Sequence, residues 1–194
     1  MKKIWWVALT LIFNSAFAQS WTKNFDYVDD FHSGLAKVEK GGKVGFVDEN
    51  GKVVVAITYT DAMPFSEGMA AVKGEGKWGY IDSTGKLVVP LQYCEAYSFS
   101  EGKAKVERKT WLGFIDRSGN EVIALKYKGA GAFSGGLAPV SNEKQLWGFI
   151  DASGREVIGF RYGVAKDFDG ATARVMKDGK WLEIDRSGKV VRIE

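Results

Sequence analysis

The chain has 194 residues, of which 45% are hydrophobic, and this is long enough to bury a core as one domain or one array of repeats. Its formal net charge of +3 falls to +1 without Lys2 and Lys3, so charge gives no reason to expect nucleic acid or an anionic membrane as a partner. The single cysteine, Cys94, excludes an internal disulfide, and the single histidine, His32, excludes a metal site built from several histidines.

The first eighteen residues have the layout of a secretory signal peptide. Lys2 and Lys3 form a basic start, residues 4–13 are an apolar run, and Ala16-Phe17-Ala18 is a small-residue cleavage site. The apolar run is shorter than the about 20 residues that a membrane-spanning helix needs. We therefore predict export to the periplasm or out of the cell, with cleavage before Gln19 and no transmembrane segment in the mature chain.

The rest of the chain repeats one unit five times. A phenylalanine opens each unit, and successive phenylalanines lie 34, 34, 34 and 35 residues apart, with the extra residue in the segment 141–146. These phenylalanines are Phe31, Phe65, Phe99, Phe133 and Phe168. We divide the chain into a signal peptide at 1–18, an N-terminal partial repeat at 19–30, and units at 31–64, 65–98, 99–132, 133–167 and 168–194.

Each unit has the pattern of three short strands and no helix. The first strand alternates: Ala104 and Val106 share one parity, with charged residues on the other. The second strand begins at Trp-Gly or its equivalent and runs into an Asp-x-x-Gly turn, and the third carries apolar residues at every second position. No stretch has the 3.6-residue period of an amphipathic helix, so we predict an all-β fold.

The aligned aspartates of the Asp-x-x-Gly motif are candidates for calcium binding or for turn formation. Residues 48–51 resemble part of a calcium loop, but Ca²⁺ takes six to eight oxygen ligands and the other copies place Ser, Thr, Arg or Ala between Asp and Gly. An Asp at the first position of a turn bonds its own turn backbone. We therefore predict turn hydrogen bonds, and no metal site or cofactor, at Asp48, Asp82, Asp116, Asp151 and Asp185.

The unit resembles the WG-containing repeat of bacterial proteins. The resemblance is clearest in residues 65–93, which read Phe-Ser-Glu-Gly, then Lys-Trp-Gly-Tyr-Ile-Asp, then Val-Val-Pro and a closing Tyr. The Trp-Gly pair recurs at Trp147-Gly148, whereas other units have Val44-Gly45, Trp111-Leu112 or Trp181-Leu182. The resemblance implies a β-rich repeat that is often found in exported proteins, and it brings no catalytic residues.

Aromatic side chains along the second strands are the candidate binding residues. The candidates are Trp78, Tyr80, Trp111, Trp147 and Trp181. If these rings face solvent they can stack on sugar rings or on a peptide; if they face inward they fill the core between units. We expect most of them to be core residues, and we expect Trp111, which lies one position out of register, to point elsewhere.

The arrangement of the units is open to two interpretations. Residues 25–30 match the end of a unit and could complete the fifth unit in a closed, propeller-like ring. Against this, a unit is shorter than a usual propeller blade, and Arg192 and Glu194 put charges where other units are apolar. We therefore favour an open stack of β-hairpins.

For function, we predict an exported, non-enzymatic interaction or scaffold protein with a protein or glycan partner in the envelope. The alternatives are a carbohydrate-binding protein that uses exposed Trp and Tyr, and a hydrolase with a pair of carboxylates. No catalytic motif occurs in the sequence. The places where copies differ are where we expect a site, namely Val44, Trp111-Leu112, residues 141–146 and Trp181-Leu182.

Overall fold

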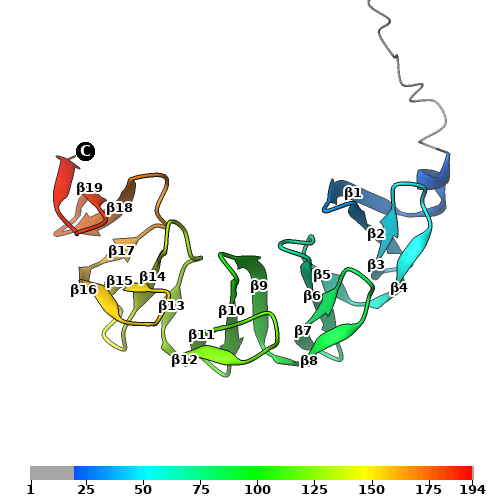
Figure 1. The fold of residues 1–194 in the computed structure, drawn as a ribbon, viewed down its shortest axis with the longest axis horizontal. Coiled ribbons are helices and arrows are strands. Elements are labelled where there is room, and N and C mark those ends of the chain that lie inside the picture. The colour runs from blue at the N-terminus through cyan, green and yellow to red at the C-terminus, as the bar shows by residue number, and fades with distance from the viewer. Residues whose placement is uncertain (1–19, 194) are drawn as a thin grey trace, which may run out of the picture.

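A computed structural model of the chain describes residues 20–193. Five four-stranded antiparallel sheets, which we call blades 1 to 5, follow one another along an open arc (Figure 1). A short 3-10 helix, η1 (Trp21–Asn24), precedes them. The strands of blades 1 and 2 are β1 (Tyr27–His32), β2 (Leu35–Lys40), β3 (Lys43–Asp48), β4 (Val53–Tyr59), β5 (Asp61–Ala62), β6 (Met69–Gly74), β7 (Lys77–Asp82) and β8 (Leu87–Tyr93). Those of blades 3 to 5 are β9 (Glu95–Ser100), β10 (Lys103–Arg108), β11 (Trp111–Ile115), β12 (Glu121–Tyr127), β13 (Gly129–Ala130), β14 (Leu137–Ser141), β15 (Trp147–Asp151), β16 (Glu156–Tyr162), β17 (Val164–Ala165), β18 (Thr172–Lys177), β19 (Lys180–Asp185) and β20 (Val190–Ile193).

The prediction of an open all-β array of five repeated units is confirmed, but a blade has four strands where we predicted three. The additional strand is the first of each blade, and in blades 2, 4 and 5 it is two residues long, too short for alternation to reveal it. First strands line the concave side of the arc and fourth strands its convex side (Figure 1). Residues 27–30 lie in β1, which pairs with β2 within blade 1, so this segment completes the first blade and not the fifth.

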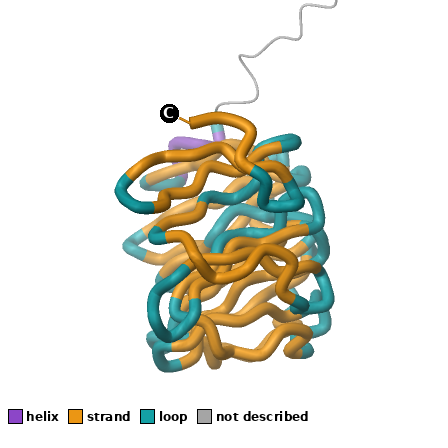
Figure 2. Tube along the Cα trace, turned by 90° about the vertical axis from the view of Figure 1, so that its left-hand side faces the viewer, coloured by secondary structure: helices purple, strands orange, loops and turns teal. Residues whose placement is uncertain are grey.

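The loops gather along two opposite sides of the array (Figure 2). Hairpins between second and third strands, together with the links between blades, form one side, which we call the hairpin face. Turns between first and second strands and between third and fourth strands form the other side, the turn face. No helix in residues 20–193 is long and apolar enough to cross a membrane.

The glycine of the Trp-Gly pair lies under a bulge of the fourth strand. In blade 2, Trp78 pairs with Tyr93 and Tyr80 with Val89, so the outer strand holds two extra residues between these pairs. A Cβ on Gly79 would lie 2.4 Å from the Val89 carbonyl oxygen, and Gly45, Gly113 and Gly148 meet the same obstruction. Blade 5 has Leu182 at this position, and there the bulge next to the glycine is absent: Leu182 pairs with Ile193 and Glu183 with Arg192, before the register shifts between Glu183 and Ile184.

Ring pairs join consecutive blades. The aromatic residue of each third strand packs edge-to-face on the opening phenylalanine of the next unit, as Tyr80 does on Phe99 with ring centroids 5.1 Å apart. The other pairs are Phe46–Phe65, Phe114–Phe133 and Phe149–Phe168, at 4.7, 4.9 and 5.1 Å. The opening phenylalanines of blades 2 to 5 are thereby buried.

The Phe-Ser-Glu-Gly motif adds polar bonds to the same joints. The hydroxyl of Ser66 donates to the Phe99 carbonyl at 2.8 Å, and Ser100 and Ser134 repeat this bond one blade further along. The Glu67 carboxylate accepts from Gly102 N and from Arg117 of the next blade, and hydrogen bonds to Arg117 and Gly102 lower its pKa although burial opposes them. The motif therefore fixes one blade to the next.

The aspartates act as turn residues, as predicted. In each copy Asp Oδ1 accepts backbone N–H groups two and four residues on, as Asp82 does from Thr84 and Lys86 at 2.9 and 3.1 Å. The Thr84 hydroxyl also donates to this carboxylate and lowers its pKa. Within residues 20–193, no group of three or more His, Cys, Asp or Glu side chains is placed to hold a metal ion.

The two end blades carry different residues at the positions that join inner blades. At the first blade, Trp21 of η1 packs edge-to-face on Phe31 with ring centroids 6.4 Å apart. In an inner blade the opening phenylalanine packs instead on the aromatic residue of the preceding blade's third strand. At the fifth, Glu183 replaces that aromatic residue, and its Oε1 lies 3.7 Å from Nη1 of Arg192. A charged pair thus stands where inner blades present apolar side chains.

Candidate functional site

The five candidate aromatic residues separate into two groups. Trp78 and Tyr80 are buried, with 3% and 0% of their surfaces exposed, so they are core residues. Trp111, Trp147 and Trp181 are half-buried and are the first or second residue of the third strands of blades 3, 4 and 5, at the hairpin face. The structure therefore leaves three adjacent blades with a tryptophan that can be reached from solvent.

The hydroxyl of Tyr80 makes two hydrogen bonds inside the structure, and they explain why this side chain is buried. Its hydroxyl donates to the carbonyl of Tyr97 at 2.8 Å and accepts from the N–H of Tyr97 at 3.2 Å, which ties blade 2 to the first strand of blade 3. Burial raises the pKa of Tyr80, so its hydroxyl stays protonated across the physiological range. Trp78 and Tyr80, which we named as candidate binding residues, therefore pack in the core and are not reached from solvent.

Trp111 precedes by one residue the position aligned with Trp78, which Leu112 occupies, so its side chain starts on the opposite side of the strand. The Lys128 ammonium, from the link between blades 3 and 4, lies 3.6 Å from the centroid of the Trp111 ring. In blade 5 the Arg174 guanidinium lies 5.0 Å from the Trp181 ring in a similar way. Both rings are thus paired with a cation, which increases the polarity of the surface that they present.

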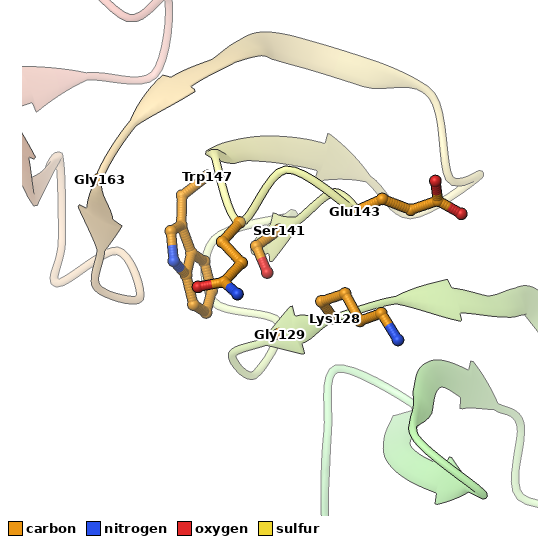
Figure 3. A pocket seen from close by; sticks show the side chains of 7 residues that line it. Lys128, Gly129, Ser141, Glu143, Trp147 and Gly163 are labelled. Atoms are coloured by element: carbon orange, nitrogen blue, oxygen red, sulfur yellow. The ribbon is translucent and has the colours of Figure 1, made fainter.

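Trp147 lines a pocket of about 350 Å³ on the hairpin face (Figure 3). The lining comes from the link into blade 4, the inserted hairpin and the link into blade 5: Lys128, Gly129, Ser141, Glu143, Gln145, Trp147 and Gly163. In Figure 3 the Ser141 hydroxyl lies beside the indole of Trp147, while Glu143 is directed away from the ring. Because Lys128 also covers Trp111, the two rings belong to one continuous surface.

Two glycines leave the Trp147 pocket open. A Cβ on Gly129 would meet the indole at 2.7 Å, so the ring lies directly over bare backbone. Trp147 pairs with Tyr162, and the next residue is Gly163, whereas Trp78 pairs with Tyr93, which is followed by Cys94. The aligned tryptophans of blades 2 and 4 therefore differ in surroundings: Trp78 is buried, whereas Trp147 lines a pocket.

The inserted hairpin is held in shape by a side-chain turn. Asn142 Oδ1 accepts the N–H of Lys144 at 3.0 Å and the N–H of Leu146 at 3.1 Å, which reproduces the Asp turns of the third strands. Gln145 takes the left-handed conformation with φ of 60°. This places the exposed side chains of Glu143 and Gln145 at the mouth of the pocket.

The chemistry of the pocket is that of a binding site. It offers one aromatic face, one hydroxyl, one amide, one carboxylate and one ammonium. The sequence indicated Trp147 and the 141–146 insertion, but it did not indicate Lys128 and Gly163, which link consecutive blades, or Gly129, which begins β13. The sequence feature that marks these three residues is that other units have different residue types at the aligned positions.

The comparisons with known proteins agree with this architecture. Among solved structures, the computationally designed Ika8 protein has a TM-score of 0.55 and 15% identity, with 84% of this chain and 60% of that one covered. Hsv2 of Kluyveromyces lactis, in the structure described with a complete loop 6CD, has a TM-score of 0.54 and 15% identity, with 86% and 62% covered. The chain thus spans less than two thirds of their length, and the likeness concerns the fold alone. No curated protein matches the chain.

These features define an open array of radial four-stranded blades, the blade type of β-propellers without ring closure. The chain belongs to the WG containing repeat family: the family profile matches residues 22–43, 45–78, 78–109, 113–144 and 147–181.

Proposed function

We propose that the protein is an exported, non-enzymatic interaction module that binds a protein partner of the periplasm or cell surface through the hairpin face of blades 3 to 5. The observation that carries the proposal is the continuous surface of Trp111, Lys128 and Trp147. Tryptophan and arginine are residue types that protein interfaces favour, and the same face carries Arg174 beside Trp181 on blade 5. The signal-peptide pattern of residues 1–18, which lie outside the described residues, supports export.

The Trp147 pocket supports binding rather than hydrolysis. Glycoside hydrolysis uses two carboxyl groups on either side of the scissile bond, and Glu143 is the one carboxylate among the residues that line this pocket. A ring with amide and hydroxyl groups at its edge can recognise a ligand without a reaction. We propose no cofactor.

A capture experiment tests the proposal. The purified protein is immobilised and exposed to an envelope extract of the native cell, and retained proteins are compared with those on a Trp111→Ala/Trp147→Ala double variant. A Val122→Ala variant, altered on the convex side where Val122 is 40% exposed, is the matched control. We expect a partner that wild type and the control retain and the double variant loses. Equal retention by all three would overturn the proposal.

Carbohydrate binding is the second candidate, and the open face of Trp147 beside Ser141 favours it. A sugar ring that stacks on this indole would change its fluorescence. Titration with envelope glycans separates the two functions, because glycan binding predicts quenching that Trp147→Ala removes and Trp181→Ala keeps. An unchanged spectrum across the panel would exclude it.

A further inference from the structure

A second pocket lies on the concave side of the arc, away from the hairpin face. It has a volume of about 320 Å³ and is lined by residues of blades 2 to 5: Met63, Tyr97, Ser98, Lys103, Lys105, Phe114, Gly131, Ala132, Phe133 and Asp167. Its walls are mainly aromatic and aliphatic, and they carry two ammonium groups and one carboxylate. Such a combination is typical of sites for small ligands.

Lys105 is held in a fixed position inside this pocket. Its Nζ donates to the Ala130 carbonyl at 2.7 Å and lies 3.8 Å from the centroid of the Tyr97 ring. The backbone of Tyr97 is in turn fixed by the Tyr80 hydroxyl. Burial lowers the pKa of Lys105, while Asp167 acts in the opposite direction. The ammonium is therefore oriented in advance, and it is partly stripped of water.

Asp167 is the one carboxylate among the residues that line this pocket. Its Oδ1 accepts the N–H of Ala132 at 3.1 Å. A Cβ on Gly131 would collide with this carboxylate, so the glycine makes room for it. Burial around the carboxyl raises the pKa of Asp167, and the bond from Ala132 and the charge of Lys105 oppose this. Asp167 and Lys105 do not form an ion pair with each other, so each charged group retains bonding capacity toward a ligand.

Neither charge is needed to pack one blade on the next. The residues aligned with Lys105 in blades 2 and 4 are Ala71 and Pro139, and those aligned with Asp167 in the same blades are Pro64 and Ala132. The opening phenylalanines of these two blades, Phe65 and Phe133, form the same ring pairs with the preceding blade although their own blades lack the charges. Burying half of an ammonium group costs desolvation free energy that packing contacts do not offset. A bound anion would offset this cost.

We propose that this pocket binds the carboxylate end of an apolar amino acid, either free or at the C-terminus of a peptide. The carboxylate binds the ammonium of Lys105, with Lys103 beside it. The N–H of the same residue, an ammonium in a free amino acid and an amide in a peptide, donates to Asp167. The apolar side chain packs against Met63, Tyr97 and Phe133. The charges of Lys105 and Asp167 are then used by one small group.

The test is calorimetric titration of the whole protein with three probes: L-leucine, the tripeptide Ala-Ala-Leu, and the same tripeptide with a C-terminal amide. We expect one of the two carboxylate probes to bind and the amide to bind at least about tenfold more weakly, because an ionic hydrogen bond is lost. Stronger binding of leucine identifies a free amino acid as the ligand, and stronger binding of Ala-Ala-Leu identifies a peptide end. Equal binding of acid and amide, or no binding of any probe up to about 10 mM, would overturn the proposal.

Variants locate the site. Lys105→Met removes the ammonium and keeps an unbranched side chain one atom shorter, and it should weaken binding of the carboxylate probe by about tenfold or more, whereas Lys144→Met, on the exposed hairpin, should leave that binding unchanged. Asp167→Asn should weaken leucine more than the peptide, because it removes the charge that faces an ammonium. Circular dichroism confirms that each variant is folded, and the acid–amide comparison needs no variant at all. Full affinity in Lys105→Met would contradict the assignment. Because the pocket lies on another face, this outcome is independent of the capture experiment.

Discussion

Replacing Gly79 by alanine should destabilise the protein more than the small size of the added methyl group suggests. The added Cβ would lie 2.4 Å from the Val89 carbonyl oxygen and 2.8 Å from the Pro90 carbonyl carbon, both of which are backbone atoms in the neighbouring strand. A side chain could rotate away, but this backbone can move only if the bulge of the fourth strand opens. We expect a cost of about 3 kcal/mol, the upper end for overpacking. For a chain of this size that corresponds to a fall of about 6–12 °C in the melting temperature.

Gly163→Ala is the matched control for thermal unfolding. Gly163 does not lie in the left-handed region, and the nearest atom to its added Cβ is the Met176 carbonyl oxygen at 3.8 Å. Alanine there should be neutral or stabilise by about 0.4–1 kcal/mol through the unfolded state. If Gly79→Ala and Gly163→Ala melt together, the bulge does not explain the Trp-Gly pair.

Three further predictions concern the joints and the turns. Ser100→Ala removes the 2.7 Å bond to the Phe133 carbonyl and should cost about 0.5–1.5 kcal/mol in denaturant unfolding, whereas Ser83→Ala, in an exposed turn, should not. Tyr80→Phe leaves both polar groups of Tyr97 without their partner and should cost about 1–3 kcal/mol; a stability equal to wild type would count against this joint. Thermal stability should fall as the pH drops below about 4, because hydrogen bonds from Thr84 and Asn120 hold the pKa values of Asp82 and Asp116 below their usual range. The folded state therefore binds protons at these two carboxylates less readily than the unfolded state does. Their stabilising contribution is present above the pKa of the unfolded state and is lost as the pH falls through the pKa of the folded state. A melting temperature that is constant from pH 6 to about 2 would contradict it.

The repeat and its strands could be predicted from the sequence because their signals are local and recur. Parity at Ala104 and Val106 and the Asp-x-x-Gly spacing report directly on strand faces and turns. The first strand of a blade could not be predicted in this way. Asp61–Ala62 is two residues long, and its pairing with Val72 and Lys73 depends on the tertiary arrangement of the blade.

The candidate site was only partly predictable for a related reason. Trp78 and Trp147 are identical residues at aligned positions, and alignment cannot distinguish their exposure. What differs is the neighbouring backbone: Gly129 and Gly163 open a pocket around Trp147. The concave pocket was not predicted, because Lys105 and Asp167 are far apart in sequence. Only the curvature of the array brings both side chains to the lining of one pocket.

The most direct test of the proposed function is site-specific photo-crosslinking in the native cell. A benzophenone amino acid replaces Glu143 at the mouth of the Trp147 pocket in one variant, and Val122 on the convex side in another. We predict that the residue 143 variant yields a crosslinked species of defined mass that Trp111→Ala/Trp147→Ala abolishes, and that the residue 122 variant does not. Crosslinking at residue 122 alone, or equal crosslinking at both positions, would contradict binding through the hairpin face.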